Sequence, residues 1–171
     1  MKARRFIFLA IFTLCNLTAF SQNSPFGGWH KYPFIESTYI TQAMFDMAPD
    51  VKIGNTTLKD LSNILDQVEI YRNLPPTLGM DGWKGEDMKT YAINIGKRNG
   101  YEMALSITTD NTEIIFYVKR ARENRSIIRD LIVIRLEPAK NRHRSCVAIR
   151  LVGKFTFKDI QGIIGTRQKI T

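Results

Sequence analysis

Apolar and polar residues alternate along most of the chain after Tyr101, and this pattern constrains the fold more than any other feature of the sequence. A period of two places successive side chains on opposite faces of a β-strand. Four such stretches follow one another, joined by short polar segments, at residues 102–108, 113–119, 128–136 and 145–152. Strands connected in this way pair antiparallel with their neighbours. The sequence therefore predicts a four-strand antiparallel meander.

Two of these stretches carry apolar residues on both of their faces. The third stretch has Ile128, Ile132, Ile134 and Leu136 on one face and Ile127, Leu131 and Val133 on the other. The second stretch adds Ile115 and Tyr117 to its second face. A sheet with one solvated face would be polar there. We therefore expect the second face to be partly covered, by the N-terminal helices or by another copy of the chain.

Four segments with helical spacing of apolar residues are expected to pack against this sheet. They run from a cap at Ser37 to Pro49, from Thr57 to about Asp66, from Glu86 to a stop at Gly100, and onward from Thr156. A short alternating strand, Val68 to Tyr71, lies between the second helix and the third. The prolines and glycines between this strand and the third helix indicate a loop. The expected class is α+β: an antiparallel sheet, made of the meander and one further short strand, packed with about four helices.

The first 21 residues have the pattern of a secretory signal peptide. Lys2, Arg4 and Arg5 precede an apolar run, and Ala19-Phe20-Ser21 supplies the small residues of a cleavage site. A membrane span needs roughly 20 apolar residues, and this run is shorter. We therefore expect export, with no transmembrane span in the mature chain. The alternatives are a buried N-terminal helix and a lipid anchor on Cys15.

Cleavage after Ser21 would leave a basic chain with one cysteine, Cys146. That residue lies in an apolar stretch, so we expect a buried, inert thiol. No repeat or long linker divides the remaining residues. The expected domain organisation is a signal peptide at 1–21, a loosely held N-terminal arm at 22–36, and a single α+β domain at 37–171.

Several segments in this order resemble a family of exported bacterial domains of unknown function, numbered 4252. They are Thr38 to Met44, Leu65 to Tyr71, the basic and apolar hairpins, and Gly153 to Ile160. The resemblance covers roughly Phe34 to Ile164, but the loop from Asn73 to Trp83 does not match the family pattern. The family belongs to Gram-negative bacteria typified by gut commensals and has no assigned activity. The resemblance implies a periplasmic or outer-surface protein and supplies no site residues.

The sequence lacks the residue constellations of common enzymes. Only His30 and His143 could act as imidazole bases, and one is in the arm and the other in a hairpin loop. No G-x-S-x-G, H-E-x-x-H, Walker or G-x-G-x-x-G motif appears. A zinc site would have to gather both histidines, Cys146 and a carboxylate from remote positions. The sequence therefore predicts no catalytic residue, no metal and no cofactor.

Two sets of carboxylates deserve a functional interpretation beside a structural one. Asp81, Glu86 and Asp87 could form an acid/base pair or hold calcium, but turn formation and helix-dipole stabilisation explain all three. Asp130 falls on the strand face shared by Ile128 and Ile132. If it is buried, it either pairs with an arginine or has a raised pKa. A strand-end position near Arg129 is the simpler alternative.

Basic residues form two runs, and these are the strongest functional feature of the sequence. The first run is Lys119, Arg120, Arg122 and Arg125, and the second is Lys140, Arg142, His143 and Arg144. Alternate turns of a meander lie at opposite ends of the sheet, so the two runs should be some 30 Å apart. Lys97 and Arg98 should join the first run. These six cations form the predicted anion-facing surface, and solvated hairpin tips are the alternative.

Two hypotheses from different classes follow. The first is a non-catalytic exported module that binds a protein partner, an anionic envelope component or a second copy of itself. The second is an envelope hydrolase or lyase built on Asp130 or on the loop from Asp81 to Asp87. Nucleic acid is disfavoured by the expected export and by the lack of exposed stacking aromatics among the cations. The sequence favours the first hypothesis.

Overall fold

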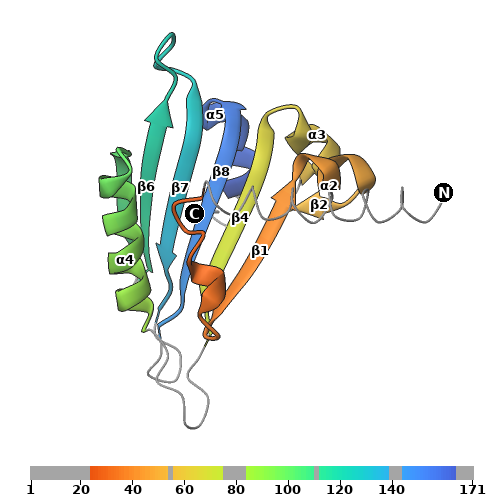
Figure 1. Cartoon of the computed structure of the whole chain (residues 1–171). Helices are drawn as coiled ribbons and strands as arrows, with labels where there is room; N and C mark the ends of the chain where they lie inside the picture. Colours follow the sequence, from red (N-terminus) through yellow and green to blue (C-terminus); the bar gives the residue numbers. More distant parts are fainter. Residues whose placement is uncertain (1–23, 54–55, 75–83, 110–111, 139–143, 165–171) are drawn as a thin grey trace, which may run out of the picture.

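The protein folds around one six-stranded antiparallel sheet, seen in the computed structural model of Figure 1. The structure describes residues 24–53, 56–74, 84–109, 112–138 and 144–164. The strands are β1 (Ile35–Thr41), β4 (Leu65–Asn73), β5 (Glu102–Thr109), β6 (Thr112–Arg120), β7 (Ile128–Leu136) and β8 (Cys146–Phe155). Their order is β1-β4-β8-β7-β6-β5. The predicted meander, β5 to β8, is confirmed, and β1 and β4 extend it beside β8.

Helices cover both faces of this sheet (Figure 1). The α4 face packs against α4 (Gly85–Arg98) and the 3-10 turn η1 (Trp29–Lys31). The α5 face packs against α2 (Gln42–Met47), α3 (Leu58–Ser62) and α5 (Phe157–Ile164). A small hairpin, β2 (Lys52–Ile53) and β3 (Thr56–Thr57), forms a second sheet. The expected cover of the second face is therefore present, and the N-terminal helices α2 and α3 supply part of it.

The longest helix, α4, follows the expectation from the sequence. Glu86 and Asp87 lie in its first turn, where the helix dipole favours negative charge. Met88 and Ala92 are fully buried against the sheet. Gly100 ends the segment with a φ of 73°, a conformation that glycine adopts without the steric cost of a Cβ atom. Cap, charges and apolar stripe agree here, and they fix the helix locally.

The first expected helix is wrong over its N-terminal half. Residues 35–41 form β1, which pairs antiparallel with β4 from Ile35 opposite Asn73 to Thr41 opposite Gln67. This segment is rich in β-branched and aromatic residues, which pack well on a pleated surface. Only the short helix α2 remains; it buries Phe45, whereas Met44 and Met47 are exposed. Strand pairing with β4 outweighs the helical spacing of apolar residues in this segment.

The second expected helix is shorter than predicted and the strand after it is longer. Thr57 caps α3 through reciprocal hydrogen bonds with Asp60, so its start is as expected. It ends at Ser62, and Leu65 belongs to β4. Because β4 pairs with β1 on one side and β8 on the other, backbone hydrogen bonding extends the strand over nine residues.

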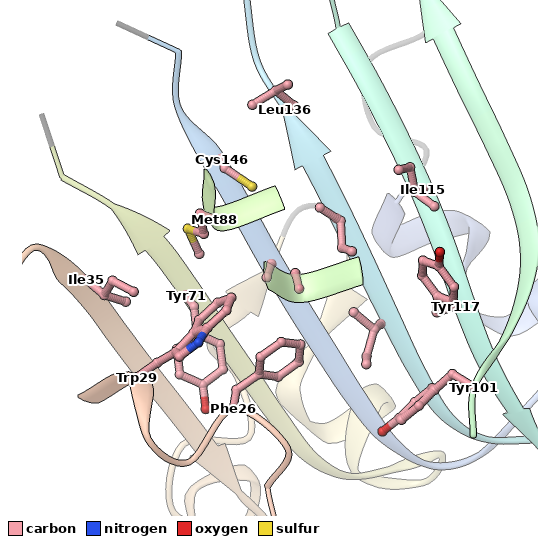
Figure 2. Packing of buried hydrophobic residues seen from close by; sticks show 14 residues of the cluster. Phe26, Trp29, Ile35, Tyr71, Met88, Tyr101, Ile115, Tyr117, Leu136 and Cys146 are labelled. Atoms are coloured by element: carbon pink, nitrogen blue, oxygen red, sulfur yellow. The ribbon is translucent and has the colours of Figure 1, made fainter. Parts of the chain in front are cut away.

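The N-terminal segment is not the loosely held arm expected from its composition. Phe26 and Trp29 are fully buried, and their rings lie 5.3 and 5.2 Å from that of Tyr71 (Figure 2). β1 also begins at Ile35, inside the range assigned to the arm. Aromatic side chains bury large apolar areas, so this short segment completes the core on the α4 face. Residues 1–21 lie outside the described ranges.

A β-bulge changes the face of one predicted core residue. The register between β7 and β8 shifts between Ile128 and Asp130. Ile128 therefore packs on the α5 face, whereas Ile132 packs on the α4 face. The expectation that Ile128 shares a face with Ile132 is wrong, because a bulge inserts one residue into the period of two. The helix expected from Thr156 is confirmed as α5.

In the described ranges, every helix is too short or too polar to cross a membrane.

Close backbone packing at Gly153 yields a test of the strand register. A Cβ atom there would overlap the carbonyl oxygen of Ile64 and lie 2.8 Å from the Cα atom of Leu65. Gly153→Ala should therefore lower the free energy of unfolding by about 1–3 kcal/mol in urea titrations. Gly28→Ala is the matched control, because no atom lies within 4 Å of its added Cβ. Equal stability of both variants would contradict this register.

Candidate functional site

A surface pocket of about 540 Å³ opens where β6 ends and the turn to β7 begins. Its lining residues are Gly100, Glu102, Val118, Lys119, Arg120, Ala121, Arg122 and Arg125. Four of them are cations and one is a carboxylate. The antiparallel connection from β6 to β7 brings these residues together, because it returns the chain at the end where α4 also stops.

All six residues of the predicted anion-facing surface lie at this end of the sheet. Lys119, Arg120, Arg122 and Arg125 line the pocket. Lys97 and Arg98 are exposed in the last turn of α4, just before Gly100, and are not among the lining residues. The six cations therefore share one end, and four of them share one pocket.

Glu102 organises two of the pocket arginines. Its carboxylate accepts a hydrogen bond of 2.6 Å from Nε of Arg120 and lies 3.5 Å from Nη2 of Arg125. Arg120 also donates from Nη1 to the backbone carbonyl of Arg125 at 2.8 Å. These contacts join β5, β6 and the turn after β6. Glu102 thus occupies part of the cationic pocket as an internal anion.

Lys119 marks the boundary between the pocket and the interior. Its ammonium nitrogen lies 4.3 Å from the ring centre of Tyr101, a cation–π arrangement. Tyr101 is 6% exposed. Burial raises the pKa of its hydroxyl, and the negative charge of Asp130 raises it further. The Tyr101 hydroxyl therefore stays protonated, and the buried ring contacts the Lys119 ammonium through its face.

Of the second basic run, the structure describes only Arg144, which lies away from this pocket. Arg144 lies two residues before Cys146, the first residue of β8, which pairs with Leu136, the last residue of β7. Arg144 forms an ion pair of 3.3 Å with Glu86 and donates to the backbone carbonyl of Glu137 at 3.1 Å. Lys140, Arg142 and His143 lie outside the described residues. Arg144 therefore lies at the opposite end of the sheet.

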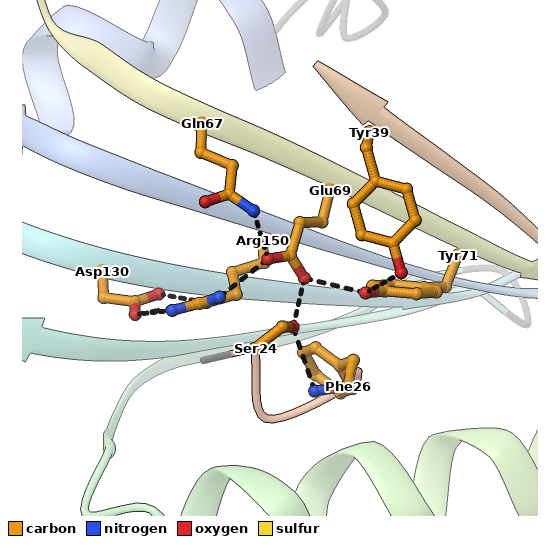
Figure 3. Close-up of polar contacts among 8 residues, drawn as sticks. All are labelled: Ser24, Phe26, Tyr39, Gln67, Glu69, Tyr71, Asp130 and Arg150. Carbon is orange, nitrogen blue, oxygen red and sulfur yellow. Dashed lines mark hydrogen bonds and ion pairs between the residues drawn. The ribbon is translucent and has the colours of Figure 1, made fainter. Parts of the chain in front are cut away.

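A buried ion cluster lies on the α4 face of the sheet (Figure 3). Arg150 of β8 donates to Asp130 of β7 from Nε at 3.1 Å and from Nη2 at 2.7 Å. Its Nη1 donates to Glu69 of β4 at 2.7 Å. Glu69 is 0% exposed, Asp130 7% and Arg150 9%. One guanidinium therefore joins three neighbouring strands and holds two carboxylates away from water.

Neutral groups complete the hydrogen bonding of Glu69. Its oxygens accept from Gln67 Nε2 at 2.8 Å, from the Tyr71 hydroxyl at 2.9 Å and from Ser24 Oγ at 2.5 Å. The Tyr39 and Tyr71 hydroxyls lie 3.0 Å apart. Ser24 therefore ties the N-terminal segment to a buried carboxylate, beside the aromatic contacts of Phe26.

The charges of this cluster shift the pKa values of their neighbours in consistent directions. Burial alone would lower the pKa of Arg150, but its hydrogen bonds and ion pairs with Asp130 and Glu69 raise it overall. Burial raises the pKa of Tyr71, and the nearby carboxylate of Glu69 adds to this rise. Arg150 stays charged and Tyr71 stays protonated, so the cluster keeps its hydrogen-bonding pattern.

Asp130 is buried and paired with an arginine, one of the two alternatives expected for it. Its partner is Arg150, across the strand pair, and not the neighbouring Arg129, which is exposed. Sequence reasoning missed Glu69 and Arg150. Both interrupt apolar stretches that the sequence assigns to strands, and a charge at such a position needs a partner. That signal could have identified the cluster.

The remaining candidates have structural roles where they are described. Asp87 accepts from the backbone N–H of Lys84 at 3.1 Å and caps α4, whereas Asp81 lies outside the described residues. Burial raises the pKa of the Cys146 thiol to about 12, as suits an inert cysteine. Across the ranges that the structure describes, no group of three or more His, Cys, Asp or Glu side chains is placed to hold a metal ion.

The ion cluster generates a stability prediction. Among the contacts described, Arg150 supplies the only guanidinium that pairs with Glu69 and Asp130. Arg150→Ala should therefore lower the free energy of unfolding by about 3–5 kcal/mol. The triple variant Glu69→Gln, Asp130→Asn, Arg150→Met removes all three charges and should recover part of this loss. Arg129→Ala, an exposed neighbour, is the control. A loss below about 1 kcal/mol for Arg150→Ala in urea unfolding would contradict a buried cluster.

Comparison with known proteins places this architecture in a family. The sequence model of a domain of unknown function, DUF4252, matches residues 31–163, which span β1 through most of α5. No curated protein and no solved structure matches the chain. The matched residues include every strand of the six-stranded sheet and both basic hairpin ends, so the chain belongs to the DUF4252 family.

Proposed function

We propose that the protein is an exported, non-catalytic binding module of the cell envelope, and that its cationic pocket receives the phosphate groups of anionic lipids. The observation that carries the proposal is the pocket of about 540 Å³ lined by Lys119, Arg120, Arg122 and Arg125. Export rests on the pattern of residues 1–21, with a periplasmic or outer-surface location in a Gram-negative bacterium as the family resemblance implies.

The chemistry of the pocket suits a phosphate group. Its volume lies within the roughly 300–1,000 Å³ of ordinary ligand sites. Guanidinium groups present several donors in a plane, which matches phosphate oxygens in two-point contacts. Arg122 and Arg125 are exposed, so they can reach an anion without leaving a buried partner.

The position of the pocket suits a ligand that is part of a membrane surface. The turn between β6 and β7 extends beyond the rest of the molecule at this end (Figure 1). Lys97 and Arg98 lie at the same end and add positive charge around the pocket. A negatively charged membrane attracts such clusters by about 1 kcal/mol for each Lys or Arg near its surface. The end of the sheet can therefore approach a lipid surface directly.

The alternative, an envelope hydrolase or lyase built on Asp130, has weaker support. Both oxygens of Asp130 receive hydrogen bonds from Arg150, which leaves little of the carboxylate for general acid or base work. Glu69 is held by four donors and is 0% exposed. These contacts favour a structural role for both carboxylates.

The lipid proposal predicts that pocket arginines control vesicle binding. Arg122→Ser with Arg125→Ser should weaken binding to phosphatidylglycerol-containing vesicles about 30-fold, since each arginine contributes about 1 kcal/mol. Vesicle sedimentation over a range of lipid concentrations measures this change. The matched control is Lys31→Ser with Arg72→Ser, which removes the same charge from exposed residues outside the pocket. Equal weakening by both pairs, or binding to neutral phosphatidylcholine vesicles, would contradict a site in the pocket.

The carboxylate of Glu102 should compete with lipid phosphates for Arg120 and Arg125. Glu102→Gln removes the negative charge that pairs with Arg120 and Arg125, so the variant should bind anionic vesicles about 2–5-fold more tightly, as the loss of an exposed ion pair allows. The exposed carboxylate of Asp66, in β4, supplies the control variant Asp66→Asn. Weaker binding by Glu102→Gln would show that Glu102 only holds the pocket in shape.

A further inference from the structure

One edge of the sheet is exposed along a whole strand. β5 is the last strand in the order and pairs only with β6 within the described sheet. Seven of its eight residues are exposed, and Ile107 is half-buried. Met103 and Leu105 are 62% and 46% exposed. An edge strand with free backbone N–H and C=O groups is a template for pairing with another strand.

β5 carries few of the features that prevent such pairing. Its sequence contains no lysine, arginine or proline, and its single charged residue, Glu102, is paired with Arg120 and Arg125. A bulge between Met103 and Leu105 distorts only its first part. β1, the strand at the opposite edge, contacts η1 and α2. The region from Leu105 to Thr109 is therefore a regular, uncharged edge.

We propose that this edge is an interface, and that β5 pairs antiparallel with β5 of a second copy of the chain. A two-fold axis at Ser106 places Leu105 of one copy opposite Ile107 of the other. Both side chains lie on the α5 face, since they pair with Phe116 and Ile114 of β6. Directly opposite apolar pairs stabilise antiparallel strands. The sequence of β5 thus complements itself in this register.

Continuity of the apolar surface supports the same occupant. On the α5 face, Leu105 continues a row of apolar side chains that crosses the sheet through Phe116, Val133, Ile149 and Ile70. The partner's Ile107 would extend this row across the interface, and the partner's row would continue from there. Each exposed Leu105 would then gain an apolar neighbour in place of water.

Charge favours antiparallel pairing of two copies over parallel pairing. The cationic pocket lies at the Glu102 end of β5. In an antiparallel pair the two pockets lie at opposite ends of the joined strands, about 25 Å apart at 3.4 Å per residue. Strands paired in parallel would bring the two cationic ends together. The antiparallel interface therefore avoids direct repulsion between the two cationic pockets.

Sedimentation of the purified protein tests the proposal. The wild type should pass from monomer to dimer between low and high micromolar concentrations. Leu105→Lys places a charge in the paired edge and should raise the dissociation constant at least tenfold. Met47→Lys is the matched control, because Met47 is 84% exposed on α2, away from β5. A wild type that stays monomeric at high micromolar concentration would overturn the proposal and favour an extended peptide as the partner of β5.

Cross-linking tests the register without charging the strand. Ser106→Cys should form an intermolecular disulfide under mild oxidation, since opposite residues in an antiparallel pair lie within the distance a disulfide spans. Ser126→Cys, exposed in the turn after β6, should not cross-link to the same extent. The dimer uses another surface if Leu105→Lys leaves its dissociation constant unchanged and Ser106→Cys does not cross-link. This result would also refute the proposal. Neither experiment depends on the binding of anions.

Discussion

Apolar side chains on both faces of the central strands determine how the rest of this protein is arranged. Ile132 and Ile134 of β7 face α4, while Leu131 and Val133 face the opposite layer, and all four are buried. A strand of this kind is stable only where both faces are covered. The chain meets this constraint with α4 and the N-terminal segment on one side and α2, α3 and α5 on the other. Much of the charge is then placed at the ends of the sheet, and β5 is left at an edge.

The buried ion cluster is the exception to this separation of polar and apolar groups. Arg150 donates hydrogen bonds to Glu69 and Asp130 in place of the water that these buried carboxylates lose, and these bonds join three strands. Buried pairs of this kind contribute little net stability but are costly to break. Ser24 extends the cluster to the N-terminal segment. The cluster therefore constrains which strands are neighbours and where the segment before β1 docks.

Local signals predicted the meander and α4, and they left an arginine pair as one of the alternatives for Asp130. These features depend on periodicity, caps and burial, which a sequence carries directly. The start of β1 and the position of Ile128 on the α5 face were not predictable in the same way. Residues 35–41 form a strand because β4 lies beside them, and the bulge at Ile128 depends on register with β8. At the candidate site, topology predicted that Lys97 and Arg98 share an end with the first basic run, but not that Glu102 occupies its pocket.

Under the proposed function, anionic lipids bind at the pocket end of the sheet and not over its faces. Hydrogen–deuterium exchange with and without phosphatidylglycerol vesicles tests it most directly. We expect slower exchange confined to residues 100–102 and 118–125, the segments that line the pocket. Slower exchange around Arg144 at the opposite end, or over Ile149 and Ile70 on the α5 face, would contradict it.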